Sequence, residues 1–166
     1  MKKTIVNKSA LPAPQPAPAF HSNQLTIDRF RIIRGSLDAT EDFDPKMVEQ
    51  YEVNYNFDMG FNISGNLVRS ILKVDVKTKS SVGQASEAKG NFVLHYYFTV
   101  DRLKNLTKPN ANGVVTVNSD LANAVASVTY STTRGILMAR MQNTAFENFI
   151  LPIVNPNELV KSGARR

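Results

Sequence analysis

The sequence predicts an α+β fold in which strands come first and helices come last. Apolar residues occupy every odd position from 51 to 63, which is the period of a half-buried strand. After residue 119 the apolar residues recur at a spacing of three to four, which is the period of an amphipathic helix. The chain has 166 residues and is 42% hydrophobic, so it is long enough for one domain with a single core.

The beginning of the chain differs in composition from the rest. Prolines alternate with Ala and Gln between positions 12 and 18, a pattern that favours extended, solvated backbone. We therefore expect a flexible arm at 1–22, one folded domain at 23–160 and a basic tail at 161–166. Asn7 and Lys8 interrupt the apolar residues near the start before a signal-like stretch forms, so we expect no export signal and a cytoplasmic location.

Residues 25–38 mix apolar and polar side chains in a way that predicts the first strand, bent near Gly35. The acidic segment from Glu41 to Pro45 then predicts a turn. Its carboxylates lack the spacing of an EF-hand loop, so no calcium site is expected there.

The alternating residues 51–63 predict one arm of a hairpin, and residues 68–79 predict the other. Gly65 and Asn66 between them suit the positive backbone dihedrals of a two-residue turn. That turn predicts these facing pairs: Ile63 with Val68, Met59 with Leu72, Phe57 with Val74, Tyr55 with Val76, Asp58 with Lys73, and Glu52 with Lys79. A slip of one residue would put the two apolar sets on opposite faces, so the pattern specifies the register strongly.

The polar stretch from Lys79 to Gly90 predicts a loop, and the alternation at 92–100 predicts a further strand. His95 falls on the less apolar face of that strand. We expect it to pack and to make a hydrogen bond, because no partner His, Cys or carboxylate indicates a base or a metal ligand.

Ser119 and Asp120 predict the start of a long helix, with Ser119 as its cap. The helical spacing continues to Met141, and residues 142–144 indicate a break. The apolar segment 146–151 then stops at a proline, and Pro156 predicts the first turn of a final helix.

The composition argues against several kinds of chemistry. The chain has no Cys, which removes disulfides, thiolate metal sites and a cysteine nucleophile. It has two histidines, too few for a histidine metal cluster, and no GxxxxGK, HExxH or GxSxG motif. We therefore expect no enzyme activity and no cofactor. The apolar runs are also far shorter than the roughly 20 residues that a membrane span needs.

The net charge of +6 is concentrated at the two ends of the chain. The arm and the tail each carry three basic residues and no acid, so residues 23–160 are neutral. Arg29 and Arg31 share one face of the first strand, close to Arg34, but the sheet aromatics follow the core period instead of that face. We interpret this as a solvated basic face and do not expect a nucleic-acid partner. A nucleic-acid-binding module with basic tails is kept as an alternative.

Three segments in the last third of the chain form a distinctive series: Tyr130-Ser131-Thr132-Thr133-Arg134-Gly135-Ile136-Leu137, then Thr144-Ala145-Phe146, then Leu151-Pro152-Ile153-Val154-Asn155-Pro156-Asn157-Glu158-Leu159. This series resembles the SecB family of export chaperones and its SecB-like relatives. In that family a long helix with an aromatic residue and an arginine leads to an apolar linker, and a Leu-Pro, Asn and Leu pattern opens the last helix.

The resemblance implies a four-stranded antiparallel sheet packed against two C-terminal helices and assembled as a dimer or a tetramer. It also implies a chaperone that binds unfolded polypeptides without ATP, for protein export or for a dedicated partner such as an antitoxin. The client-binding candidates are Phe146, Phe149, Ile150 and Leu151 near the last helix, and Tyr55, Phe57, Met59 and Phe61 on the sheet. For the strand residues, ordinary core packing is the competing interpretation. Tyr130 and Arg134 are expected to orient helices or to line a subunit contact.

One feature departs from the standard export chaperones. They present an acidic sheet face and tail to the translocation motor SecA, whereas this hairpin mixes acids with lysines and the tail ends in Arg165-Arg166. The departure argues against coupling to SecA, while a dedicated client is compatible with it. A β-rich structural or assembly protein, which buries the same apolar faces against its own copies, is the other alternative.

Overall fold

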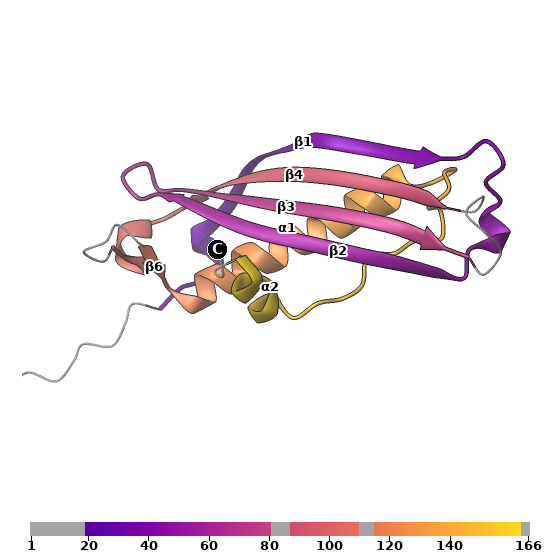
Figure 1. Ribbon diagram of the computed structural model, residues 1–166. Helices are drawn as coiled ribbons and strands as arrows, with labels where there is room; N and C mark the ends of the chain where they lie inside the picture. The colour runs from indigo at the N-terminus through magenta and orange to yellow at the C-terminus, as the bar shows by residue number, and fades with distance from the viewer. Residues whose placement is uncertain (1–18, 81–86, 110–114, 164–166) are drawn as a thin grey trace, which may run out of the picture.

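The protein is a four-stranded antiparallel sheet with one long helix across one face, as seen in a computed structural model that describes residues 19–80, 87–109 and 115–163 (Figure 1). The strands are β1 (Leu25–Ala39), β2 (Gln50–Asn62), β3 (Leu67–Lys79) and β4 (Ala88–Val100), in the order β1-β4-β3-β2. The helices are α1 (Ser119–Arg140) and α2 (Pro156–Gly163). The predicted α+β class, with four antiparallel strands and two C-terminal helices, is confirmed.

Short elements connect these parts. Among the described residues three are 3-10 helices: η1 (Ser22–Gln24), η2 (Pro45–Met47) and η4 (Leu103–Leu106). A second sheet pairs β5 (Thr107–Pro109) with β6 (Val115–Val117). Most of the predicted arm and the end of the predicted tail lie outside the described residues.

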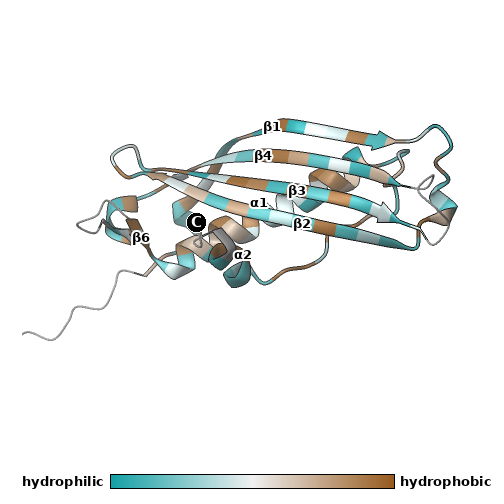
Figure 2. Ribbon diagram, in the orientation of Figure 1, coloured by the Kyte–Doolittle hydropathy of each residue, from teal (hydrophilic) through white to brown (hydrophobic). Residues whose placement is uncertain are grey.

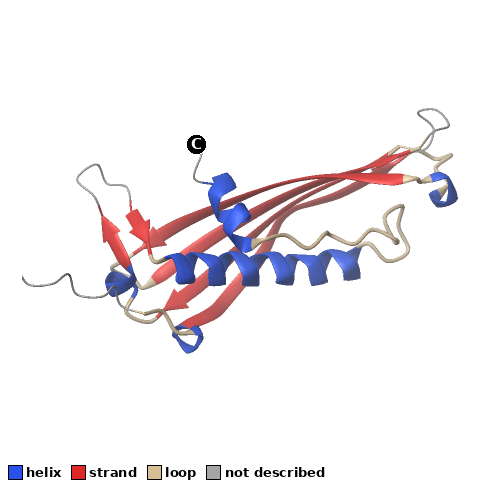
Figure 3. Cartoon of the chain, turned by 90° about the horizontal axis from the view of Figure 1, so that it is seen from below, coloured by secondary structure: helices blue, strands red, loops and turns tan. Residues whose placement is uncertain are grey.

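The alternation along the strands determines which side of the sheet is covered. In β3 and β4 every second residue is buried. Hydrophilic and hydrophobic residues alternate along these strands (Figure 2), and α1 lies across one face of the sheet (Figure 3). Leu72 and Leu94 are fully buried there, against Val125 and Leu137 of the same core cluster. We call the opposite side, which no helix in the described part of the chain covers, the open sheet face.

Two hydroxyl pairs cross the core between the sheet and α1. Ser70 and Thr129 lie 2.6 Å apart through their hydroxyl oxygens, and the Tyr96 hydroxyl lies 2.8 Å from that of Thr133. All four side chains are buried, so each polar group gains a partner that water would otherwise supply. These pairs fix how α1 sits along the sheet.

The hairpin register differs from the prediction by two residues. Phe61, not Ile63, faces Val68, because four residues, 63–66, connect the strands. The Asn62 carboxamide oxygen accepts hydrogen bonds within this connection, and Asn66 adopts the left-handed conformation with φ 54°. A shift of two preserves the faces, so the apolar set stays on the α1 side.

The predicted charge pairs change with the register. Glu52 lies opposite Lys77 but forms its ion pair diagonally with Lys79. Asp58 lies opposite Ile71, so its predicted direct pairing with Lys73 is wrong.

Strand β1 has two register shifts, and the second lies next to the bend predicted near Gly35. The shifts lie between Ile27 and Arg29 and between Ile32 and Arg34. Strand β4 starts at Ala88, so the predicted loop to Gly90 is too long. The residue that caps α1 is Asn118 and not Ser119 as predicted. The Asn118 side chain accepts hydrogen bonds from the first free backbone N–H groups of the helix.

Candidate functional site

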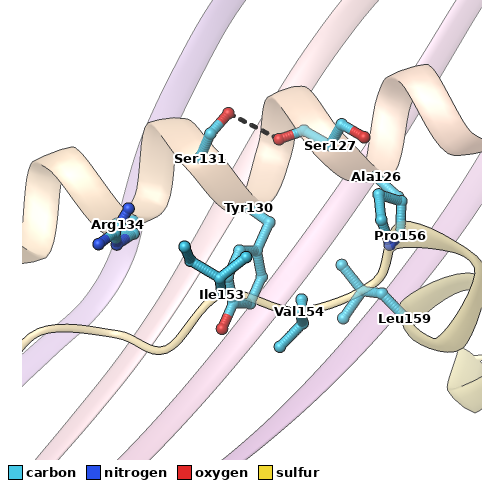
Figure 4. Close-up of a pocket in the computed structure, with 9 residues that line it drawn as sticks. All are labelled: Ala126, Ser127, Tyr130, Ser131, Arg134, Ile153, Val154, Pro156 and Leu159. Carbon is cyan, nitrogen blue, oxygen red and sulfur yellow. Dashed lines mark hydrogen bonds between the residues drawn. The ribbon is translucent and has the colours of Figure 1, made fainter.

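An open groove lies between α1 and the segment that follows it. We call residues 141–155 the linker, and the space between α1, the linker and α2 the helix–linker groove. Its volume is about 250 Å³. The lining residues are Ala126, Ser127, Tyr130, Ser131 and Arg134 from α1, Ile153 and Val154 from the linker, and Pro156 and Leu159 from α2 (Figure 4).

The sequence builds each wall of the groove for a local reason. The α1 residues recur at spacings of three and four, which places them on one side of the helix. Pro152 and Pro156 keep the linker between them from continuing as a helix. The Asn155 carboxamide oxygen accepts from the Asn157 backbone N–H at 3.0 Å and thereby caps α2.

Tyr130 ties the linker to α1. Its hydroxyl donates a hydrogen bond of 2.7 Å to the carbonyl oxygen of Pro152, and its ring meets the ring of Tyr55 edge-on at 5.8 Å. Burial raises the pKa of Tyr130 to about 12; Tyr55 adds to the increase and Arg134 opposes it. The phenol is therefore a neutral hydrogen-bond donor over the physiological pH range.

Arg134 brings a polar group without a partner to the same groove. Its Nε atom is buried and has no hydrogen-bond partner among the residues that the structure describes. A buried donor in this condition costs free energy until an acceptor reaches it. A carbonyl or carboxylate oxygen of a bound molecule is the kind of acceptor that Arg134 lacks.

The rest of the lining is mostly apolar, and part of it is exposed. Ile153 is 85% exposed, the largest value among the exposed large hydrophobic residues of the described chain. Leu159 is 1% exposed and closes the α2 side. The groove is therefore closed on its α2 side by the buried Leu159, and its rim is the solvent-exposed apolar side chain of Ile153.

The predicted client-binding residues are mostly core residues in this chain. Phe57, Phe146, Phe149 and Leu151 are each at most 4% exposed. The remaining sheet candidates, Tyr55, Met59 and Phe61, are partly buried and pack against the core.

Of the predicted linker residues, only Ile150 is open to solvent, at 52% exposed. Phe149 instead packs its ring 5.3 Å from that of Tyr51. The linker residues that line the observed groove, Ile153 and Val154, therefore follow the predicted residues 146–151 in the chain. Tyr130 and Arg134 do line it, as contacts within one chain.

Sequence reasoning missed Ile153 and Val154 as groove residues. A usable signal was present, because both follow Pro152 in a stretch that cannot be helical before Pro156. A short extended stretch has little contact with the core, so some of its apolar side chains are expected to be exposed. Their spacing alone gives no preference between core and surface.

Two further kinds of feature are absent from the residues that the structure describes. No group of three or more His, Asp or Glu side chains in them is placed to hold a metal ion. No helix of the described chain is long and apolar enough to cross a membrane.

Comparison with known proteins supports the fold. No family model matches the sequence, and no curated protein matches it. The SecB-like chaperone Rv1957 of Mycobacterium tuberculosis, solved in complex with a ChAD peptide from the Rv1956 HigA1 antitoxin, superposes with a TM-score of 0.58 at 11% identity. The match covers 80% of this chain and 91% of that one, so the chain has a SecB-like fold. A Streptococcus agalactiae protein of unknown function covers 78% of this chain and 97% of its own at 9% identity, with a TM-score of only 0.31.

Proposed function

We propose that this protein is an ATP-independent chaperone that holds non-native polypeptide segments in the helix–linker groove. The observation that carries the proposal is the groove itself, which is apolar, open and lined by side chains from three elements. Stability of the fold does not require an exposed Ile153 beside a cavity, and exposed apolar surface of this kind is typical of a binding site.

The energetics suit a holding function. Covering apolar surface contributes about 25 cal/mol per Å², from which the cost of ordering the bound segment is subtracted. The groove volume of about 250 Å³ lies below the roughly 300–1,000 Å³ of most small-molecule sites. It therefore suits one or two client side chains at a time, with neighbouring client residues spread over the rim.

A polypeptide client is also the partner that the polar groups of the groove favour. The unpartnered Arg134 Nε can donate to one of the backbone carbonyls that every extended segment carries, whereas the Ser131 hydroxyl already donates to the Ser127 carbonyl oxygen. The SecB-like neighbour was solved with an antitoxin peptide, which supports this class of partner. The client is an unfolded chain bound for export or a dedicated partner such as an antitoxin.

We further propose that the protein works as a dimer or a tetramer in the cytoplasm. Strand β1 is an edge strand with exposed apolar side chains, notably Ile27 and Phe30, and unpaired edges of this kind favour association. The structural alternative is that another copy seals the helix–linker groove completely. Binding of an apolar dye by the intact oligomer supports an open groove, and its absence supports a sealed one.

The direct test is suppression of aggregation of a chemically unfolded client, without nucleotide, at stoichiometric ratios. The native protein should slow aggregation. Ile153→Ser should weaken this effect several-fold while leaving thermal unfolding nearly unchanged, because the side chain is 85% exposed. Leu67→Ser, an exposed apolar change on another element, is the matched control and should behave like the native protein.

Three results would overturn the proposal. Failure of the native protein to slow aggregation would leave the structural alternative. An equal loss of aggregation suppression in the Ile153 and Leu67 variants would mean that the groove is not the client site. Tight binding of single-stranded RNA, lost steeply with salt and without preference for unfolded protein, would favour the nucleic-acid alternative.

A further inference from the structure

The open sheet face brings basic residues from two strands into one group. Strands β1 and β3 both flank β4, and their register aligns three rows across the sheet. The rows are Arg29–Tyr97–Arg69, Arg31–His95–Ile71 and Arg34–Val93–Lys73. Five cations thus surround a centre of β4 side chains, an arrangement that exists only because β1 pairs with β4. We call these three rows the basic face.

No acid neutralises these five cations directly. None of them lies within ion-pair distance of a carboxylate among the described residues. Asp28 beside β4 accepts instead from the Thr99 hydroxyl at 2.6 Å. Asp58 lies at the margin on β2, and Asp75 lies on β3 two residues from Lys73, so one acid stands beside the five cations. The centre of the face is therefore positive although residues 23–160 as a whole are neutral.

His95 at the centre responds to this environment. Burial is the main cause that lowers the pKa of His95, and the positive charges of Arg69 and Lys73 lower it further. The imidazole is therefore neutral at physiological pH, and the positive charge of the face comes from the arginines and Lys73.

A hollow of about 400 Å³ lies at one side of the same face. Its polar lining is made by the cations Arg34 and Lys73 with one acid, Asp75, and with Asn91, and its apolar lining includes Ile33 and Val93. Ile33 sits at the second register shift of β1 and is 55% exposed. An apolar side chain flanked by cations is thus presented to solvent, on the side of the sheet away from α1.

We propose that the basic face is a second interaction surface, which binds an acidic segment of a partner polypeptide with an apolar side chain between its carboxylates. The carboxylates pair with Arg34 and Lys73, while the apolar side chain covers Ile33 in the hollow. The surface is distinct from the helix–linker groove, so a client and this partner bind independently.

The structure favours a polypeptide over single-stranded RNA for two reasons. The aromatic ring best placed for base stacking, Tyr97, is covered by the Arg29 guanidinium, whose carbon lies 4.5 Å from the ring centroid. Asp58 and Asp75 also interrupt a continuous path for phosphates, whereas a peptide can place its carboxylates between them.

The test measures binding of a fluorescein-labelled synthetic peptide with Asp-Leu-Glu repeats to the full chain by anisotropy. The Kd should rise steeply with NaCl, and a peptide with Asn and Gln in place of the acids should bind about tenfold more weakly or worse. Arg34→Gln combined with Lys73→Gln should weaken the acidic peptide to a similar degree. Arg140→Gln combined with Lys161→Gln removes the same charge elsewhere and is the matched control.

A second measurement reports the site without any variant. Addition of the acidic peptide to the native protein should shift the NMR signals of the His95 and Tyr97 rings and leave the Ile153 methyl groups unchanged. Ile153→Ser should bind this peptide normally even if its chaperone activity is lost, which separates this inference from the proposed function.

Three outcomes would overturn the inference. One is the absence of salt-sensitive binding of the acidic peptide to the native protein. Another is an equal effect of the two double variants, which would indicate net charge alone. The third is tighter binding of oligouridine than of the acidic peptide, which would assign the basic face to nucleic acid.

Discussion

The Tyr130 hydroxyl donates its hydrogen bond to the Pro152 carbonyl oxygen, and this contact holds the linker against α1 at the wall of the helix–linker groove. The two residues are 22 positions apart in the chain. Pro152 lies in a stretch that is neither helix nor strand, so Tyr130 supplies the hydrogen bond that its carbonyl would receive in regular secondary structure. The contact therefore determines where the linker runs and hence the width of the groove.

Tyr130→Phe should lower the free energy of unfolding by about 1 kcal/mol, because it removes one hydrogen bond and keeps the ring. It should also speed hydrogen exchange of linker amides, since the linker loses its attachment to α1. Urea unfolding and exchange measured together check this. Unchanged linker exchange would show that packing alone holds the linker.

Arg134→Met should separate client binding from stability. The substitution removes a buried donor that has no partner, so the free energy of unfolding should stay within about 0.5 kcal/mol of the native value. Peptide binding in the groove should weaken several-fold, because the client loses its donor. Calorimetric binding alongside urea unfolding checks both parts, and strong destabilisation with normal binding would contradict the assignment.

Thr133→Val should destabilise the protein by about 1–3 kcal/mol, because it leaves the buried Tyr96 hydroxyl without its partner. Tyr96→Phe in the same chain should recover part of this loss, and the double-mutant cycle gives the coupling. Thr132→Val, the adjacent and less buried threonine, is the control and should have little effect. Strict additivity of the Thr133 and Tyr96 changes would contradict the pairing.

Asn118→Ala should cost about 1 kcal/mol of stability through loss of the α1 cap. Ser119→Ala should have an effect near zero, since Ser119 is the first helical residue and not the cap. Thermal unfolding of both variants tests the corrected start of α1. A larger loss for Ser119→Ala would restore the cap predicted from the sequence.

The pKa of His95 gives a pH dependence with a definite sign. Because its folded pKa lies below the ordinary value of 6.5, the unfolded chain takes up a proton first as the pH falls. This contribution to stability is complete above pH 6.5 and is lost as the pH falls from there through the folded pKa. His95→Gln should therefore show a smaller loss of stability in acid than the native protein.

The environment of His95 can be tested by titration. Lys73→Gln should raise the pKa of His95 toward its ordinary value, as measured from the imidazole NMR signals. Lys46→Gln, a change outside the basic face, should leave it unaltered. A pKa that does not move in the Lys73 variant would assign the lowering to burial and Arg69.

Much of the fold was predictable because its signals are local. The alternation along β2 gave the faces correctly even with the register displaced, since a slip of two residues leaves every side chain on its own face. The spacing of α1 and the proline at the start of α2 likewise predicted both helices. The exact register depended on the four-residue connection at 63–66, whose Asn62 and Asn66 contacts a two-residue turn rule does not include.

The candidate site was less predictable, for a physical reason. Phe146 and Ile153 are both apolar residues of the linker, yet the first is fully buried and the second is 85% exposed. Periodicity cannot separate them, because the linker has no regular spacing and its burial depends on the position of α1. The resemblance to the SecB family led to Tyr130 and Arg134, but not to the linker residues that face them.

By itself, then, the sequence determined the class of fold, the side of each strand that faces the core and the absence of cysteine chemistry, because these depend on neighbouring residues or on composition. Only the tertiary structure decided that Ile153 is open while Phe146 is covered, and that arginines of β1 meet Arg69 and Lys73 across β4. Both results depend on contacts between residues far apart in the chain, which packing and strand order establish and local spacing does not encode.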